Sequence, residues 1–348
     1  DLAFKDAALR VKSLNALFYL GDEQIDFNKE GIYFSNFKLN DIQKNAFVVD
    51  GKIETTSLSN PDFQLTAKAD NFEALNSTKD DNDLYYGKVN FDADLQILGS
   101  LNFPKIEGEL AFKETTDFTY IMPQVQAGTI EREGVVLFVN KKNPDDIVTQ
   151  PNQERYNANI TEVEVDVLLK INPATKAKII LNPKTGDYVQ LQGGGDLKYK
   201  MARNGDMSLQ GKYEVKNGQL ELNFYNLVKR QFKIAEGSSV AWSGDPMNAD
   251  IDIRAIYNIE TSASSLMASQ ISAESSAVQN QYRQQLPFEV YLDVGGEINS
   301  PELNFKLDMP EANKAAINGT VYNRVLQINQ QEDELNKHVF SLLVLNRF

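Results

Sequence analysis

Residues 248–259 read N-A-D-I-D-I-R-A-I-Y-N-I, and apolar side chains occupy every second position from 249 onward. Most of the residues between them are polar or charged. Successive side chains of a β-strand point to opposite faces of the sheet, so this pattern predicts a strand with one apolar face and one solvated face. The apolar positions are Ala249, Ile251, Ile253, Ala255, Tyr257 and Ile259.

The same alternation recurs through most of the chain. It is clear in residues 89–97, 163–171, 288–294 and 303–309, and the segments between them contain Asn, Asp, Gly and Pro clusters typical of turns. We read residues 161–257 as a meander, with turns that include the G-G-G-D of residues 193–196 and the K-N-G-Q of residues 216–219. A polar stretch at residues 140–160 predicts a long loop or a domain boundary.

Two segments depart from the strand pattern. Residues 262–285 are rich in Ser, Ala and Gln and predict a loosely amphipathic helical insertion or a mobile loop. After residue 310, Ile317, Val321, Val325 and Ile328 have the spacing of one helix face. The final segment begins with acidic residues suited to a helix N-terminus and ends in an apolar run at residues 339–345. We expect that run to be either a docking helix or a strand that pairs with another protein.

Composition limits the classes of partner. The chain of 348 residues contains 49 acidic and 35 basic residues, for a net charge of -14, which opposes binding to nucleic acid or to an anionic membrane surface. Cysteine is absent, so disulfides and thiolate metal sites are excluded. No apolar run reaches the roughly 18 residues that a membrane-spanning helix needs, and the first residues lack a signal-peptide layout. We expect a piece of a longer protein whose targeting and anchoring segments lie elsewhere.

The sequence offers no catalytic constellation. The single histidine, His338, lies in the terminal amphipathic segment, where we expect an exposed position on a helix. Gly193–Gly195 precedes an alternating strand, whereas a dinucleotide fingerprint must open a helix. The acidic run before Tyr85 fails the calcium-loop pattern, because Tyr85 stands where an oxygen ligand is required. We therefore predict a protein that is not an enzyme and that has no cofactor and no metal site.

The long apolar face has two interpretations that the pattern leaves equally open. One is the closed core of a β-sandwich or barrel. The other is an open, curled sheet whose apolar concave face holds lipid chains. Both need the same stripe of Val, Ile, Leu and Phe along successive strands, so alternation cannot distinguish them.

A family resemblance favours the open groove. Residues 215–257 resemble the C-terminal module of the TamB family, within the AsmA-like superfamily of bridge-like lipid transfer proteins. The shared elements are F-x-I at residues 232–234, a glycine, a strand ending at Trp242, G-D-P at residues 244–246, and the long alternating strand quoted first. Residues 95–110 and 290–307, and the closing V-F-S-L-L-V-L-N-R-F, are also similar to the family.

The resemblance implies an elongated, curled sheet, or β-taco, with an apolar concave groove. Together with the segments described above, we predict an all-β fold with such an antiparallel sheet, a C-terminal helical segment and one helical or loop insertion. It also implies a periplasmic protein of Gram-negative bacteria that is anchored in the inner membrane and carries phospholipid toward the outer membrane. The expected partners are phospholipid acyl chains and an outer-membrane, BamA-like protein of the TamA type, which the C-terminal end would meet through its periplasmic domains. The alternative function is a non-enzymatic module for assembly of outer-membrane β-barrel proteins, with a closed β core.

We divide the chain into a groove segment (1–139), a polar loop (140–160), a C-terminal β-module (161–310) with an insertion (262–285), and an amphipathic end (311–348). The residues expected to dock the partner are Val339, Phe340, Leu342, Leu343 and Leu345. The residues expected to line the lipid groove are Phe91, Leu95, Ile97, Val163, Val165, Val167, Leu169, Ile171, Leu220, Leu222, Phe224, Ile251, Ile253, Tyr257, Phe288, Val290, Leu292, Leu303, Phe305 and Leu307.

Overall fold

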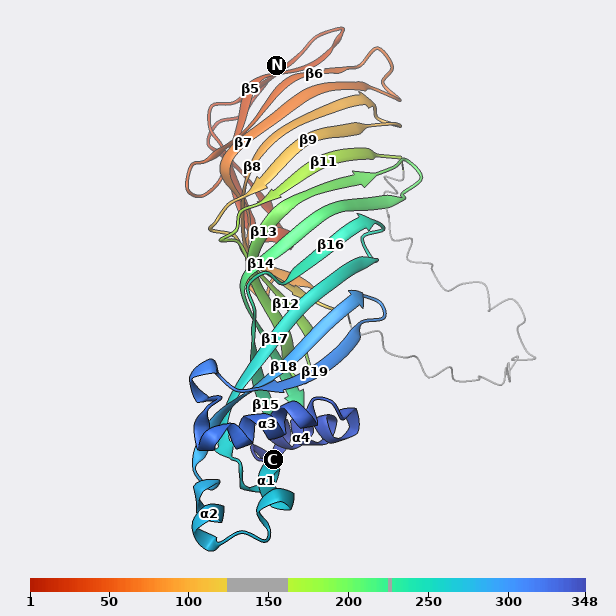
Figure 1. Ribbon diagram of the computed structural model, residues 1–348. Coiled ribbons are helices and arrows are strands. Elements are labelled where there is room, and N and C mark those ends of the chain that lie inside the picture. Colours follow the sequence, from red (N-terminus) through yellow and green to blue (C-terminus); the bar gives the residue numbers. More distant parts are fainter. Residues whose placement is uncertain (124–161, 225–226) are drawn as a thin grey trace, which may run out of the picture.

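The chain forms one long curled sheet that ends in a group of helices (Figure 1). The structure, a computed structural model, describes residues 1–123, 162–224 and 227–348. Within those ranges all strands belong to a single 19-stranded sheet. The predicted all-β curled sheet with a C-terminal helical segment is therefore confirmed. The predicted polar loop at 140–160 lies outside the described residues.

The strands contain many β-branched and aromatic residues, which fit a pleated, half-buried surface. Their bounds are β1 (Leu2–Ala3), β2 (Ala7–Val11), β3 (Ala16–Leu20), β4 (Gln24–Phe27), β5 (Gly31–Asn40), β6 (Ala46–Glu54), β7 (Asp62–Ser77), β8 (Tyr85–Ser100), β9 (Lys105–Phe112), β10 (Asp117–Ile121), β11 (Glu164–Ile171), β12 (Lys176–Asn182), β13 (Asp187–Met201), β14 (Met207–Phe224), β15 (Val228–Ile234), β16 (Ser239–Gly244), β17 (Ala249–Ser262), β18 (Gln285–Glu297) and β19 (Glu302–Asp308).

The helices are α1 (Ser264–Ile271), α2 (Ser276–Gln281), α3 (Thr320–Ile328) and α4 (Glu332–Leu345), with short 3₁₀ turns η1 (Lys12–Leu14), η3 (Glu311–Asn313) and η4 (Ala316–Gly319). The segment at 262–285 thus contains the two short helices α1 and α2. In α3 the predicted face is present, because Val321, Val325 and Ile328 are fully buried. Ile317 lies instead in η4, with a left-handed backbone (φ 49°).

Most neighbouring strands are antiparallel, but two pairs are parallel, so the sheet is mixed. β9 and β10 lie end to end along β8, and β11 and β12 lie end to end along β13. The two end-to-end pairs of strands run in the same direction, so β9 pairs in parallel with β11, and β10 pairs in parallel with β12. The expectation of a purely antiparallel sheet was wrong at this point. The same pairing joins the predicted segments 1–139 and 161–310 in one sheet, and their division into domains stays a prediction.

Two predicted turns are in fact sharp bends inside single long strands. Residues 193–196 lie within β13, and residues 216–219 lie within β14. A Cβ at Gly193 would come within 2.1 Å of the Glu214 carbonyl oxygen, and one at Gly195 within 2.0 Å of the Lys212 carbonyl oxygen. Only glycine allows these backbones to approach so closely. The glycines therefore permit the bend from which the two walls of the curled sheet diverge, rather than a reversal of the chain.

Candidate hydrophobic groove

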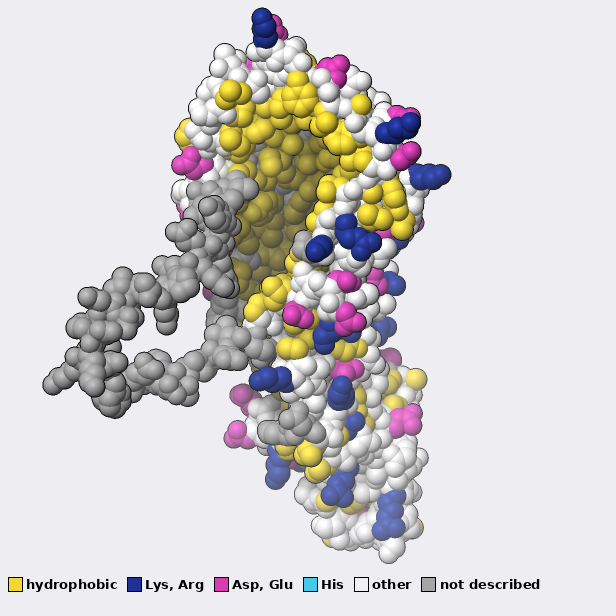
Figure 2. Space-filling model, turned by 180° about the vertical axis from the view of Figure 1, so that it is seen from behind, with side chains coloured by type: hydrophobic (Ala, Val, Ile, Leu, Met, Phe, Trp, Pro, Cys, Tyr) yellow, Lys and Arg dark blue, Asp and Glu magenta, His cyan; other side chains and the backbone are white. Residues whose placement is uncertain are grey.

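The concave side of the sheet is a hollow lined by hydrophobic side chains (Figure 2). The strand register explains its continuity, because directly paired residues point to the same face. One row of paired residues crosses the sheet from β5 to β17 without a charged side chain. It consists of Leu39, Phe47, Ala69, Ala93, Leu110, Leu169, Leu197, Gly211, Trp242 and Ala249.

The convex side carries ion pairs between neighbouring strands. Lys170 Nζ lies 2.7 Å from Glu109 Oε1, and Lys198 Nζ lies 2.5 Å from Asp166 Oδ1. Hydrogen bonds from Lys198 and Lys200 lower the pKa of the Asp166 carboxyl below its usual value. Pairs as exposed as these contribute little to stability individually. Their consequence is a solvated outer face behind an apolar inner face.

The hollow is open over its middle strands. Leu95 and Ile97 of β8, Val165 and Leu169 of β11, and Ile106 of β9 are all only half-buried, although no charged residue separates them. In a closed core such side chains would be covered. This part of the apolar face is therefore accessible from the hollow.

The N-terminal strands cover a small part of the face. Ala16 and Phe18 of β3 pack against Phe72 of β7, with 5.2 Å between the ring centroids of Phe18 and Phe72. Phe91 packs beside them, with its ring centroid 6.1 Å from that of Phe72. Phe91 thus belongs to a local core at the edge of the hollow.

The C-terminal end of the hollow is closed by helices. Val294 pairs with both Ile253 and Leu303, and the side chain of Leu303 is 59% exposed. Two rows farther along, Val290 pairs with Leu307, and both residues are 0% exposed. They are covered by α1, α3 and α4, which contribute Leu266, Val325 and Leu342 to the same core. The transition from open groove to closed core thus occurs within two rows of β17–β19.

The register places the predicted groove residues on this one face, except for Val163, which precedes β11. It does not give them equal environments. Val165 and Ile253 are half-buried, whereas Phe288, Val290 and Leu307 are sealed beneath the helices. The sequence list also omitted Leu65, Leu110 and Leu197, which lie on the same face and alternate in the same way. Contact of any of these residues with lipid stays a prediction.

The predicted docking run is helical, and half of it is core. Residues 339–345 form the last part of α4, which selects the helix over the strand alternative. Val339, Leu342 and Leu343 are 2%, 0% and 2% exposed, whereas Phe340 and Leu345 are 49% and 55% exposed. Only the latter two present large apolar surface to a partner.

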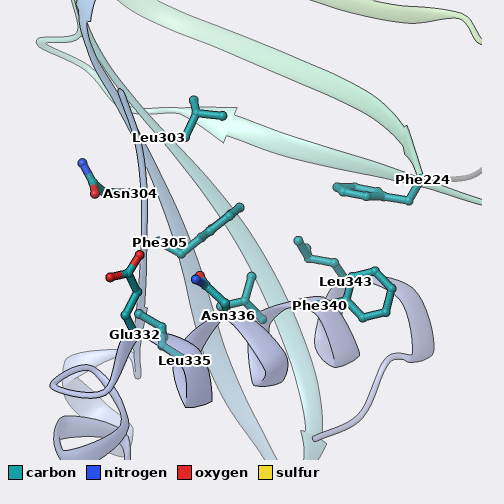
Figure 3. Close-up of a pocket in the computed structure, with 10 residues that line it drawn as sticks. Phe224, Leu303, Asn304, Phe305, Glu332, Leu335, Asn336, Phe340 and Leu343 are labelled. Atoms are coloured by element: carbon teal, nitrogen blue, oxygen red, sulfur yellow. The ribbon is translucent and has the colours of Figure 1, made fainter. Parts of the chain in front are cut away.

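A cavity of about 430 Å³ lies where the groove meets α4 (Figure 3). Phe224, at the end of β14, and Leu303, near the start of β19, lie on opposite sides of it. Its walls are mainly apolar, and no Lys or Arg is among the described residues that line it. Those residues are Phe224, Leu303, Asn304, Phe305, Glu332, Leu335, Asn336, Val339, Phe340 and Leu343.

The titratable side chains of the described residues form no metal-binding cluster. In residues 1–123, 162–224 and 227–348, no cluster of three or more His, Asp or Glu side chains could hold a metal ion. His338 is less exposed than predicted, since its side chain is 18% exposed and packs beside Glu334 and Phe348. Burial lowers the pKa of His338, against the opposing effect of the Glu334 carboxylate. None of the helices that the structure describes is both long and apolar enough to cross a membrane.

The motif around Trp242 has a structural role. The Trp242 indole donates a hydrogen bond from Nε1 to the Pro246 carbonyl oxygen at 3.1 Å, and Met247 N donates to Asp245 Oδ1 at 2.8 Å. These bonds close the connection between β16 and β17 and set the register in which Trp242 faces Ala249. The G-D-P motif therefore aligns groove-facing residues of β16 and β17.

Comparison with known proteins identifies the family. No curated protein matches the chain. The family model for the TamB C-terminal domain matches residues 35–348, which include every strand from β6 to β19 and all four helices. The chain therefore belongs to the TamB family, a periplasm-spanning family associated with TamA and involved in outer-membrane protein assembly and lipid transport.

Proposed function

We propose that this chain is the part of a periplasmic bridge-like lipid transfer protein that guides phospholipid acyl chains between the inner and outer membranes along its concave face. The single observation that carries the proposal is an apolar row of paired residues that the protein leaves partly uncovered. In this row Ile97 pairs with Ile106 and Ile106 pairs with Val165, and all three side chains remain half-buried. A continuous apolar surface that the protein does not cover is typical of a groove that binds an apolar ligand.

The energetics of lipid movement fit such a surface. Burial of one methylene is worth about 0.8 kcal/mol, so a chain of about sixteen carbons faces a barrier of roughly 13 kcal/mol on entering water. A groove that keeps the chain in apolar contact removes most of that barrier. Apolar contacts are also non-directional. The acyl chain can therefore slide along the apolar rows of the sheet without a catalytic step.

The closed-core alternative is supported most strongly at the C-terminal end, and smaller buried clusters lie around Phe72 and Val215. At the C-terminal end, Phe288, Val290 and Leu307 are completely covered by the helices. Among the described residues no helix covers the middle strands (Figure 1), where Ile97, Ile106 and Val165 stay half-buried although Val167 and Leu197 are buried. We therefore assign transport to the open rows and assembly to the helical end, where exposed Phe340 and Leu345 are our candidates for docking a TamA-type outer-membrane protein.

Site-specific photo-crosslinking tests the transport proposal. A photoreactive amino acid replaces Ile97, which faces the groove, or its neighbour Gln96, which is exposed on the outer face. Ile253 and Asp252 form a second matched pair nearer the helices. After irradiation of cells, we expect lipid adducts by mass spectrometry at Ile97 and Ile253 but not at Gln96 or Asp252. A folded protein without adducts at either groove position would refute lipid carriage.

A further inference from the structure

We propose that the cavity above α4 is the terminal acyl-chain site of the groove, from which hydrocarbon leaves sideways between Phe224 and Leu303. This inference rests on the proposed lipid-carrying function and specifies where the path ends. Its basis is the position of the cavity, which lies between the last open row of the sheet and the first fully buried one.

The cavity continues the groove rather than forming a separate pocket. Leu303 and Phe305 belong to the same apolar face as the groove, because they pair with Val294 and Leu292 of β18. Phe224 extends the opposite wall from β14, where it pairs with Val228. Figure 3 shows the side chains of Phe224 and Phe305 above α4, with Phe340 and Leu343 on the helix below. The cavity walls therefore belong to the same face of the sheet as the groove.

Helix α4 forms the floor of the cavity and is held in place, so an acyl chain cannot continue past it. Leu342 of α4, which is next to the lining residue Leu343 in the sequence, is completely buried in the core. Arg230 Nε of β15 donates to the Leu343 carbonyl oxygen at 2.7 Å, and Thr261 Oγ1 of β17 donates to the Asn346 carbonyl oxygen at 3.2 Å. These contacts hold the end of α4 against two strands of the sheet. We infer that hydrocarbon leaves on the side between Phe224 and Leu303, which lie on opposite sides of the cavity (Figure 3).

The chemistry of the cavity favours hydrocarbon over a phosphate group. Its volume of about 430 Å³ lies within the range of ligand-binding cavities. Glu332, Asn304 and Asn336 are its polar lining residues, and Glu332 forms no ion pair among the described residues. A phosphate would meet a carboxylate without a compensating Lys or Arg, whereas an acyl chain would contact Phe305, Phe340 and Leu343. The methyl end of a lipid chain is therefore the occupant that this lining fits.

The test uses the whole chain and two forms of phosphatidylethanolamine. One form carries a diazirine at the methyl end of an acyl chain, and the other carries it on the headgroup. After irradiation in mixed micelles, peptide mass spectrometry locates the adducts. We expect the methyl-end probe to label β19 near Leu303 and Phe305, and the headgroup probe to leave this peptide unlabelled. Equal labelling by both probes would overturn the proposed orientation.

Matched substitutions on α4 test the site itself. Phe340→Asp places a charge in the cavity and should lower methyl-end labelling of the β19 peptide about tenfold, because hydrocarbon then contacts a solvated carboxylate. Leu345→Asp is the control, since Leu345 is similarly exposed on the same helix but does not line the cavity. Circular dichroism and thermal melting confirm folding. Equal labelling of both variants and the unsubstituted chain would refute the terminal site.

The outcomes separate this inference from the proposed function. Labelling of β8 and β9 peptides without labelling of β19 would reject the terminal site and leave the groove function intact. Absence of labelling on all of these peptides would reject both. Protein capture by a photoreactive residue at Phe340 is expected from the proposed docking role, but capture of protein without any lipid would show that the cavity serves docking alone and would overturn the inference.

Discussion

The side chain of Asn329 pairs with both backbone polar groups of Leu307. Leu307 N donates to Asn329 Oδ1 at 2.9 Å, and Asn329 Nδ2 donates to the Leu307 carbonyl oxygen at 2.8 Å. The amide thus imitates one residue of a neighbouring strand and satisfies the outer edge of β19. It also ties the helical cap to the last strand of the sheet, because Asn329 directly follows α3.

Asn329→Ala should therefore destabilise the C-terminal end. It leaves the Leu307 N–H and carbonyl without these partners, and Leu307 is completely buried. Each unsatisfied buried group costs about 1–3 kcal/mol. We expect a loss of about 2 kcal/mol or more in urea unfolding. Asn323→Ala, at an exposed position on α3, is the control. Equal unfolding midpoints for the two variants would contradict a structural role for the Asn329 pairing.

Tyr213→Phe should stabilise the protein. Tyr213 is 8% exposed, and its hydroxyl has no hydrogen-bond partner in the part of the chain that the structure describes. Burial raises its pKa to about 12. Removing an unpaired buried hydroxyl should raise the free energy of unfolding by about 1 kcal/mol. Tyr291→Phe should do the reverse, because the Tyr291 hydroxyl donates to Glu289 Oε2 at 2.8 Å. Chemical denaturation of both variants measures the difference.

His338 should make the helical end sensitive to acid. Because burial lowers its pKa in the folded state, the unfolded state binds more protons between the two pKa values. The contribution of His338 to folding stability is fully present above its unfolded-state pKa of about 6.5. That contribution is lost as the pH falls toward the lower pKa of the folded state. Melting temperatures of the unsubstituted chain and His338→Gln, compared at pH 7.5 and 5.5, should show a smaller acid-induced decrease in the variant. Identical decreases would assign the sensitivity to other groups.

Charge substitutions should distinguish groove from core along the same face. Ile97→Asp and Val165→Asp, at half-buried positions, should lower the amount of co-purified lipid while the protein stays folded. Gln96→Asp, on the outer face, should change neither property. Val290→Asp should unfold the C-terminal core, because this fully buried site offers the carboxylate no compensating partner. Lipid extraction and circular dichroism measure the two effects separately. Unchanged lipid content in Ile97→Asp and Val165→Asp would show that these positions do not carry lipid.

The structure also changes how partner docking should be tested. Deleting α4 would remove Leu335, Val339, Leu342 and Leu343 from the core, so loss of binding after such a deletion would not identify an interface. Leu342→Ala should cost about 2–5 kcal/mol of stability. Phe340→Ala and Leu345→Ala should leave stability nearly unchanged and weaken binding to the periplasmic domains of a TamA-type protein. Unchanged affinity in the double variant would exclude this helix surface.

The sequence by itself determined the strand face of nearly every groove residue. Alternation has a period of two, so Val165, Ile253 and Phe305 could be placed on one face without knowledge of their neighbours. The helix face of Val321, Val325 and Ile328 followed in the same way from its own periodicity. Local pattern was sufficient because side-chain direction depends on the backbone of the segment itself.

Only the tertiary structure decided which parts of that face are open. Ile253 and Val290 have the same pattern, yet Ile253 is half-buried and Val290 is sealed, because helices from other parts of the chain (α1, α3 and α4) pack in the core around Val290. The bends at residues 193–196 and 216–219 resembled turns for a similar reason. Glycine is common both where a chain reverses and where two backbones approach closely. Here the glycines lie inside paired strands, and only the position of the neighbouring strand distinguishes the two cases. Exposure and bending depend on distant segments, and no local pattern encodes them.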